Sequence, residues 1–144
     1  MNRTAHIVIV GCLIRNEAGE LLLIRHHRRG WEIPQGHVDE GEDVIMAVHR
    51  EVHEETGLTV KLGPLASVWS KVSSPPALIL NFLATPSGGE LTPSPETPEL
   101  GWFNETEALQ MVEHPANRDR LLLLLEYGGD TSFHAYMTRP YRIL

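Results

Sequence analysis

Three glutamates, Glu51, Glu54 and Glu55, stand close together in one short segment, directly after Arg50. Carboxylate oxygens at this density suit two kinds of chemistry. They can bind a hard cation such as Mg²⁺, which keeps water and substrate phosphates in its remaining positions, and they can take a proton from water. The segment therefore predicts a metal–carboxylate centre that cleaves a diphosphate.

The glutamates belong to a predicted amphipathic helix within the stretch from Gly36 to Leu58. Gly57 predicts the end of this helix, because glycine readily takes the left-handed conformation that closes helices. Successive side chains are roughly 100° apart around a helix, which places Glu51 and Glu55 within roughly 20° of the centre of the apolar face and Glu54 at its edge. The apolar face consists of Val44, Ile45, Ala47, Val48 and Val52.

The direction of these carboxylates separates two interpretations. In an ordinary surface helix with ion pairs along it, the glutamates would share the polar arc with Asp43, His49 and His53. Glu51 and Glu55 instead point with the valines, and burying unpaired carboxylates is costly. A divalent cation is the simplest compensation, so the pattern favours a metal site.

Whole-chain properties narrow the classes of function. The chain has 144 residues, 42% hydrophobic and 22% charged, which fits a single domain over residues 1–144 with a substantial core. The formal net charge of −7 argues against binding to duplex nucleic acid. No leader peptide and no apolar run of about 18 residues is found, so neither export nor membrane insertion is expected. The single cysteine, Cys12, lies in an apolar run and is expected in the core. We expect a cytoplasmic protein.

Alternating and apolar stretches predict the elements that position the glutamates. The expected strands are Ala5–Ile14, Glu20–Arg25, Thr59–Leu62 with a continuation over Leu65–Val72, Ala77–Ala84 and Leu100–Phe103. We expect the second strand to pair antiparallel with the first, and the most apolar strand, Ala77–Ala84, to be central. Thr85–Pro98 contains four prolines and two glycines and is expected to be a long irregular loop.

Two further helices are expected towards the C-terminus. One covers Glu105–Val112 after a cap at Asn104, and the other covers Ala116–Tyr127, closed by the glycine pair that follows it. Five consecutive leucines, Leu121–Leu125, make the last helix apolar over more than one stripe. This predicts that it packs between the sheet and either the weakly strand-like C-terminal segment or another subunit, which would make a homodimer.

The key segment resembles the signature of the Nudix hydrolases. The likeness rests on Gly36, on Glu42 and on the run from Arg50 to Leu58, and it holds at every defined position of that signature. The preceding Trp31–Pro34 and the downstream Glu96–Phe103 are also similar to the family. This resemblance implies an α/β/α sandwich around a central mixed β-sheet and reaches about residue 126. It does not explain residues 127–144.

The resemblance also implies roles for the acidic residues. Family members use Mg²⁺ or Mn²⁺ to hydrolyse a nucleoside diphosphate linked to another group. By position, Glu51 and Glu55 would be the main metal ligands, assisted by Glu54 and by the backbone carbonyl of Gly36. Glu42 would be a further ligand or would support the ligands from behind.

Two catalytic roles follow from the same resemblance. Arg50 would orient the glutamates through an ion pair. A carboxylate must accept the proton of the attacking water. Glu54 is the first candidate for this base, and Glu96 and Glu99 are the alternatives in the downstream loop.

Substrate choice is the least determined property. The basic cluster that contains Arg28, Arg29 and Trp31 is either a patch near bound phosphates or a solvated loop tip. Gln35 replaces the glycine found in many members, which is similar to branches that act on diadenosine polyphosphates or 5′-triphosphate RNA ends. A proline loop at Ser74–Pro76 is instead similar to ADP-ribose hydrolases.

We therefore expect a small nucleotide as the substrate and rank three candidate classes. Dinucleoside or other nucleoside polyphosphates come first, ADP-ribose-type sugars second and oxidised nucleoside triphosphates third. A catalytically silent nucleotide-binding module is the alternative that is not an enzyme. Such a module would be expected to lose one or more of Glu51, Glu54 and Glu55, and all three are present.

Overall fold

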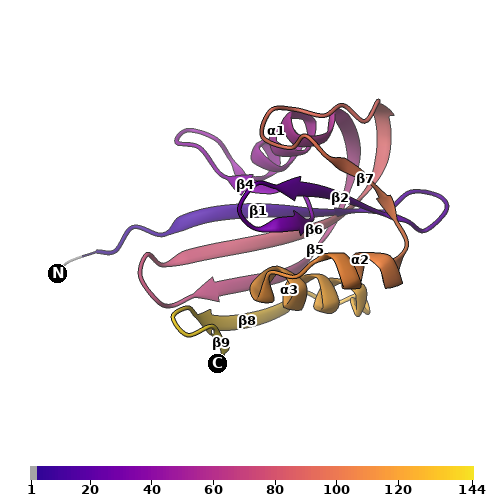
Figure 1. The fold of residues 1–144 in the computed structure, drawn as a ribbon. Coiled ribbons are helices and arrows are strands. Elements are labelled where there is room, and N and C mark those ends of the chain that lie inside the picture. The colour runs from indigo at the N-terminus through magenta and orange to yellow at the C-terminus, as the bar shows by residue number, and fades with distance from the viewer. Residues whose placement is uncertain (1–2) are drawn as a thin grey trace.

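The computed structural model describes residues 3–144 as a layered α/β fold (Figure 1). Its elements, in chain order, are β1 (Ile7–Ile14), β2 (Leu21–His26), β3 (Gly30–Glu32), β4 (Gln35–His37), α1 (Val44–Thr56), β5 (Leu58–Lys71), β6 (Ala77–Gly89), β7 (Leu100–Phe103), α2 (Glu105–Met111), α3 (Pro115–Leu125), β8 (Ser132–Met137) and β9 (Arg142–Ile143). None of the helices in this part of the chain is long and apolar enough to cross a membrane.

The central sheet has six strands in the order β4-β1-β6-β5-β8-β9. Strands β1 and β6 pair in parallel, β6 and β5 antiparallel, and β5 and β8 in parallel, so the sheet is mixed, as predicted. Strand β6, which begins with the most apolar segment of the chain, lies between β1 and β5, which confirms its predicted central place. The helices pack on the two faces of this sheet (Figure 1).

Alternation along β1 assigns the two faces. Val10 and Cys12 point into a core formed with α1, whereas Leu13 points into a second core formed with α2 and α3. Cys12 is a buried free thiol, as expected of a small core residue. The α/β/α sandwich is thereby confirmed, with α1 on one side and the C-terminal helices on the other.

The predicted pairing of the second strand with the first is wrong. Only one isolated bridge, between Arg15 and Leu21, connects β1 and β2. Strand β2 is instead the middle of a separate three-stranded sheet, in the order β3-β2-β7. Its residues Leu21–Ile24 are fully buried, because Leu22 faces the α1 core and its neighbours face the α2–α3 core.

Two predicted boundaries and the predicted burial of one residue also differ. Strand β6 continues to Gly89 against β5, so the irregular loop begins later than Thr85. Helix α3 ends at Leu125 and is capped by Glu126, whose N–H donates to two carbonyls of the last turn, so no glycine closes it. Ile45, expected on the buried face of α1, is 44% exposed because it lies at the edge of that face.

The C-terminal segment completes the sheet and covers part of α3. Strand β8 pairs with β5, and Tyr136 is buried against Trp69 and the partly buried Leu123. One side of the leucine run therefore packs against the C-terminal segment, one of its two predicted partners. Leu122 is 42% exposed, and a homodimer stays a prediction.

We expect Gly57→Ala to destabilise the fold more than Gly19→Ala does. Both glycines have φ +79°, a conformation that costs other residues about 1–2 kcal/mol. A methyl group on Gly57 would also collide with the carbonyl of Glu90 and the side chain of Thr92, whereas nothing lies near Gly19. Urea denaturation should show that the free energy of unfolding falls by more than about 2 kcal/mol in Gly57→Ala and by about 1 kcal/mol in Gly19→Ala. Equal losses would contradict the packing argument.

Candidate active site

Helix α1 positions the two inward-facing glutamates. Asp43 caps its start by accepting a hydrogen bond from the Met46 N–H at 2.8 Å, and Gly57 closes its end in the left-handed conformation, as predicted. Because Val48 and Val52 are buried on the sheet, the side chains at their flank turn towards the edge strand β4. Glu51 and Glu55 lie there, both partly buried.

Glu51 lies directly against Gly36 of β4. A β-carbon built on Gly36 would overlap the Glu51 carboxylate, so only glycine permits this approach. Strand β4 is held in place by antiparallel pairing with β1, where Gly36 lies opposite Val10. The pairing of β4 with β1 therefore places the backbone of Gly36 next to the Glu51 carboxylate.

Arg50 interacts with several acidic side chains around it. Its guanidinium donates to both oxygens of Glu42, at 2.7 and 2.8 Å, and its NH1 donates to Glu51 at 2.9 Å and to Glu54 at 3.2 Å. The same guanidinium donates to the carbonyl of His37 at 3.0 Å. Hydrogen bonds from Arg50 lower the pKa of Glu42 to about 2, so both oxygens of this carboxylate are charged and engaged.

Glu55 is the carboxylate whose charge is least compensated. Burial, followed by the negative charge of Glu51, raises its pKa from 4.5 to about 9, although the Gln35 N–H donates to it at 2.9 Å. Burial also raises the pKa of Glu51, against the opposing effect of Arg50. Two carboxylates with raised pKa values therefore share one partly buried place.

The donor chemistry of this place fits a hard divalent cation. Glu51 and Glu55 supply oxygens and surplus negative charge, and the backbone of Gly36 is adjacent to Glu51. Within residues 3–144, no three acidic, histidine or cysteine side chains are gathered as a complete ligand set. Arg50 donates hydrogen bonds to Glu42 and Glu54. Such a cation would need water or phosphate oxygens in its other positions, as Mg²⁺ commonly does.

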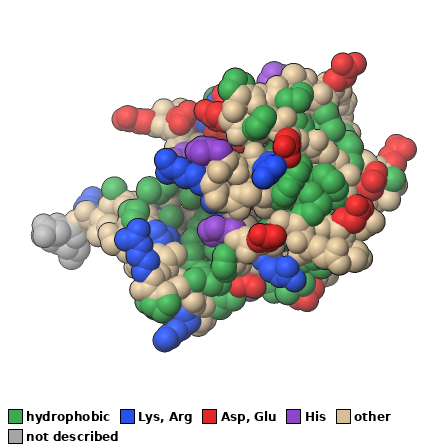
Figure 2. All heavy atoms as spheres, viewed as in Figure 1, with side chains coloured by type: hydrophobic (Ala, Val, Ile, Leu, Met, Phe, Trp, Pro, Cys, Tyr) green, Lys and Arg blue, Asp and Glu red, His purple; other side chains and the backbone are tan. Residues whose placement is uncertain are grey.

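A cleft of about 500 Å³ opens beside the two glutamates. Figure 2 shows a hollow on the viewed face with histidine and basic side chains at its border. Besides Glu51 and Glu55, the polar side chains that line the cleft are His26, Arg29, Gln35, His37, Lys71, Glu96, His114, Asn117, Arg120, Tyr136 and Thr138. Acidic groups and basic groups thus face the same cavity, as binding a metal-complexed phosphate requires.

The predicted site residues divide into those that line this cleft and those that do not. Arg29, Gln35 and Glu96 line it together with Glu51 and Glu55. The loop that carries Glu96 is tied to the end of α1, because the buried Thr97 donates to the carbonyl of Glu55 at 2.8 Å.

The other predicted residues lie outside the cleft lining. Arg28 is exposed, and Trp31 packs edge-on against Phe103 with ring centroids 5.4 Å apart. Glu99 accepts from Arg25 at 3.1 and 3.2 Å on the surface. Glu54 is exposed over 58% of its side chain and interacts with Arg50.

Glu32, a buried carboxylate behind the cleft lining, was not predicted from the sequence as part of the site. It is only 1% exposed and accepts two hydrogen bonds from Arg29, at 2.8 and 2.9 Å, and one from Asn117 at 2.7 Å. Gln35 donates to it as well. The position of this acid between Trp31 and Ile33 in an extended segment was the available signal. Its partner in α3 is 85 residues away, and no local pattern connects the two.

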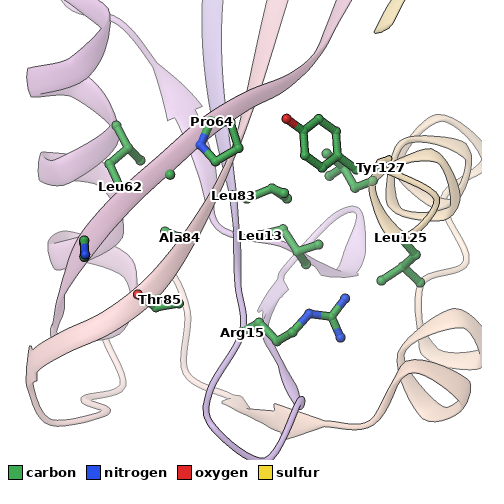
Figure 3. Close-up of a pocket in the computed structure, with 12 residues that line it drawn as sticks. Leu13, Arg15, Leu62, Pro64, Leu83, Ala84, Thr85, Leu125 and Tyr127 are labelled. Carbon is green, nitrogen blue, oxygen red and sulfur yellow. The ribbon is translucent and has the colours of Figure 1, made fainter. Parts of the chain in front are cut away.

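A second pocket, of about 460 Å³, lies on another part of the molecule (Figure 3). Leu13, Leu62, Pro64 and Leu83 give it an apolar lining, and Arg15 stands near it. Its lining contains no carboxylate or imidazole, so this pocket lacks the side chains that could bind a divalent cation in the cleft.

Comparison with known proteins agrees with the geometry. A family model described as the NUDIX domain matches residues 5–125. The chain belongs to the Nudix family. Among relatives of this Nudix chain, a MutT-like protein of Streptomyces ambofaciens is 36% identical over 108 residues, which cover 74% of this chain and 70% of the relative.

Other relatives carry names for different substrates. An 8-oxo-(d)GTP phosphatase of Mycolicibacterium smegmatis is 31% identical over 70% of this chain and 32% of its own length. An RNA pyrophosphohydrolase of Haemophilus ducreyi is 37% identical over 54% of this chain and 41% of its own length. The chain therefore spans a third to a half of the length of these curated relatives.

Solved structures show the same fold. The mutator MutT protein of Bacillus halodurans aligns with a TM-score of 0.77 and 28% identity over 96% of this chain and 94% of that one. An ADP-ribose pyrophosphatase of Streptococcus suis aligns with a TM-score of 0.74 and 27% identity over 90% of this chain and 99% of that one.

The raised pKa of Glu55 predicts how stability depends on pH in the presence of a chelator. Below about pH 4.5 this carboxyl is protonated in both states. Between about 4.5 and 9 the folded protein retains a proton that the unfolded chain has lost, so the free energy of unfolding falls as pH rises. We expect Glu55→Gln to remove this part of the pH dependence. Near pH 8 the free energy of unfolding of the variant should exceed that of the wild type by about 1 kcal/mol.

Chemical denaturation across this pH range measures the effect. The control is Glu113→Gln, an exposed substitution that should keep the wild-type pH dependence. Adding Mg²⁺ should stabilise the wild type and leave Glu55→Gln unchanged, since a ligand stabilises the state that binds it. Identical pH profiles for the wild type and Glu55→Gln would contradict the burial of a strained carboxylate.

Proposed function

We propose that this Nudix chain is a pyrophosphohydrolase that cleaves the diphosphate linkage of a nucleoside diphosphate derivative, with Mg²⁺ or Mn²⁺ as cofactor. The observation that carries the proposal is the pair Glu51 and Glu55. These carboxylates are partly buried, repel each other and open onto a cleft lined with basic side chains. A silent binding module would have no need to maintain such a costly pair.

The proposed metal ligands are the carboxylates of Glu51 and Glu55 and the carbonyl of Gly36. Bound there, a divalent ion would supply charge neutralisation at the phosphate oxygens and acidify a water molecule. Arg50 orients Glu51 through the 2.9 Å hydrogen bond and keeps Glu42 and Glu54 beside it. We assign Glu42 a supporting role, because Arg50 engages both of its oxygens.

Three glutamates remain candidates for the base that accepts the proton of the attacking water. Glu54 is the first candidate, because it lies next to the metal-site residues on α1. Glu96 is supported by its place in the cleft lining and by the attachment of its loop through Thr97. Glu99 is the third, and its surface ion pair with Arg25 favours it least.

Nucleoside or dinucleoside polyphosphates are the first proposed substrate class. The basic groups in the cleft would suit a phosphate chain longer than a diphosphate, and Arg29 and Gln35 are the proposed contacts there. ADP-ribose-type sugars come second, supported by the ADP-ribose pyrophosphatase neighbour. Oxidised nucleoside triphosphates come third, supported by the 8-oxo-(d)GTP phosphatase relative.

A panel of nucleotides with Mg²⁺ tests the proposal. We expect turnover of a diphosphate-containing compound and a fall in kcat of about a hundredfold or more for Glu51→Gln, because a proposed metal ligand is lost. Glu113→Gln should keep wild-type rates. The absence of turnover for every compound, with Mg²⁺ still bound by the protein, would refute the enzyme and favour the nucleotide-binding module.

A further inference from the structure

Arg120 is a buried cation that has no carboxylate partner. Its side chain belongs to α3 and lines the cleft, yet the residue is only 9% exposed. Across residues 3–144, no carboxylate lies within ion-pair distance of its guanidinium, whereas Arg15, Arg25, Arg29 and Arg50 each have one. An unpaired buried charge is costly, so its presence calls for another explanation.

The contacts of Arg120 satisfy only part of its guanidinium. NH1 donates to Asn117 at 3.2 Å, and NH2 donates to the Tyr136 hydroxyl at 2.7 Å. Nε is buried and finds no acceptor in the described chain. The rings of Tyr136 and Trp69, with centroids 5.3 and 6.0 Å from the guanidinium carbon, hold it in place.

A second cation, Lys71, belongs to the same end of the cleft. In the parallel pairing of β5 with β8, Lys71 lies opposite Tyr136, which is the hydrogen-bond partner of Arg120. Lys71 also lines the cleft, and no ion pair of the described residues includes it. Two uncompensated positive charges are therefore brought to one wall by α3 and β5.

This wall is separated from the metal-site glutamates by a hydrogen-bonded row of side chains. Arg120 donates to Asn117, Asn117 and Gln35 donate to Glu32, and the Gln35 backbone donates to Glu55. Within this row the charge of Arg29 is neutralised by Glu32. The cleft is thus acidic at one end and carries free positive charge at the other.

We propose that Arg120, assisted by Lys71, binds a phosphate group of the substrate that is remote from the diphosphate to be cleaved. This inference rests on the proposed function and narrows its substrate to nucleotides whose second moiety carries phosphate. A substrate that ends in a neutral sugar would leave the guanidinium uncompensated. The alternative is a structural strut, in which Arg120 only joins α3 to β8 through Tyr136.

Paired substrates distinguish the two roles. We expect Arg120→Met to raise KM about tenfold or more for diadenosine tetraphosphate, whose second moiety carries phosphate, and to leave kcat/KM for ADP-ribose within about twofold. Arg120→Lys should retain part of the affinity. Arg118→Met is the control, because Arg118 is exposed on the same helix. Equal losses for both substrates, or no loss for either, would establish the strut.

A binding measurement separates failure of this inference from failure of the proposed function. In metal-free wild-type protein, inorganic pyrophosphate should shift the ¹H–¹⁵N signal of the Arg120 Nε–H saturably, with the signal assigned by its loss in Arg120→Lys. A saturable shift without any turnover would retain the anion site and overturn the hydrolase. If the Arg120 signal does not move at saturating pyrophosphate, the anion site is refuted. Because this measurement uses the wild-type protein, it decides the question even if Arg120→Met does not fold.

Discussion

The burial of two neighbouring carboxyl groups, Glu51 and Glu55, is the constraint on which the rest of the site depends. Their burial raises the pKa of both carboxyls, and a single arginine, Arg50, is shared between Glu51 and three further acids, Asp39, Glu42 and Glu54. Packing of α1 on the sheet fixes the pair in this position, and the close approach to Gly36 leaves little room to relax. Ionising both carboxyls is therefore costly in this place, and a divalent cation bound between them, as proposed, would offset that cost.

Glu32 extends this arrangement across the cleft. Its carboxylate is buried, but four donated hydrogen bonds and the charge of Arg29 compensate it, in contrast to Glu55. By joining β3 to Asn117 of α3, it fixes the distance between the metal-site end and the wall that carries Arg120. The two buried carboxylates thus differ in the number of compensating donors, four for Glu32 and one backbone N–H for Glu55.

Local periodicity predicted the parts of this protein that depend on neighbouring residues. The helical angles placed Glu51 and Glu55 on the inner side of α1, and Gly57 marked its end. The pairing partners of the strands were harder to predict. The apolar run of β2 indicates that the strand is buried but not which strand lies beside it. The contacts of Glu32 with Asn117 and of Arg120 with Tyr136 join distant segments, so only the folded chain reveals them.

Crystals grown with Mn²⁺ test the proposed cation site at Glu51 and Glu55. An anomalous difference map should place Mn²⁺ between the carboxylates of Glu51 and Glu55 and beside the carbonyl of Gly36. Oxygen distances of about 2.2 Å are expected, close to the range for hard divalent ions. A map in which Mn²⁺ binds elsewhere, with Glu51 and Glu55 unchanged at saturating metal, would contradict the account.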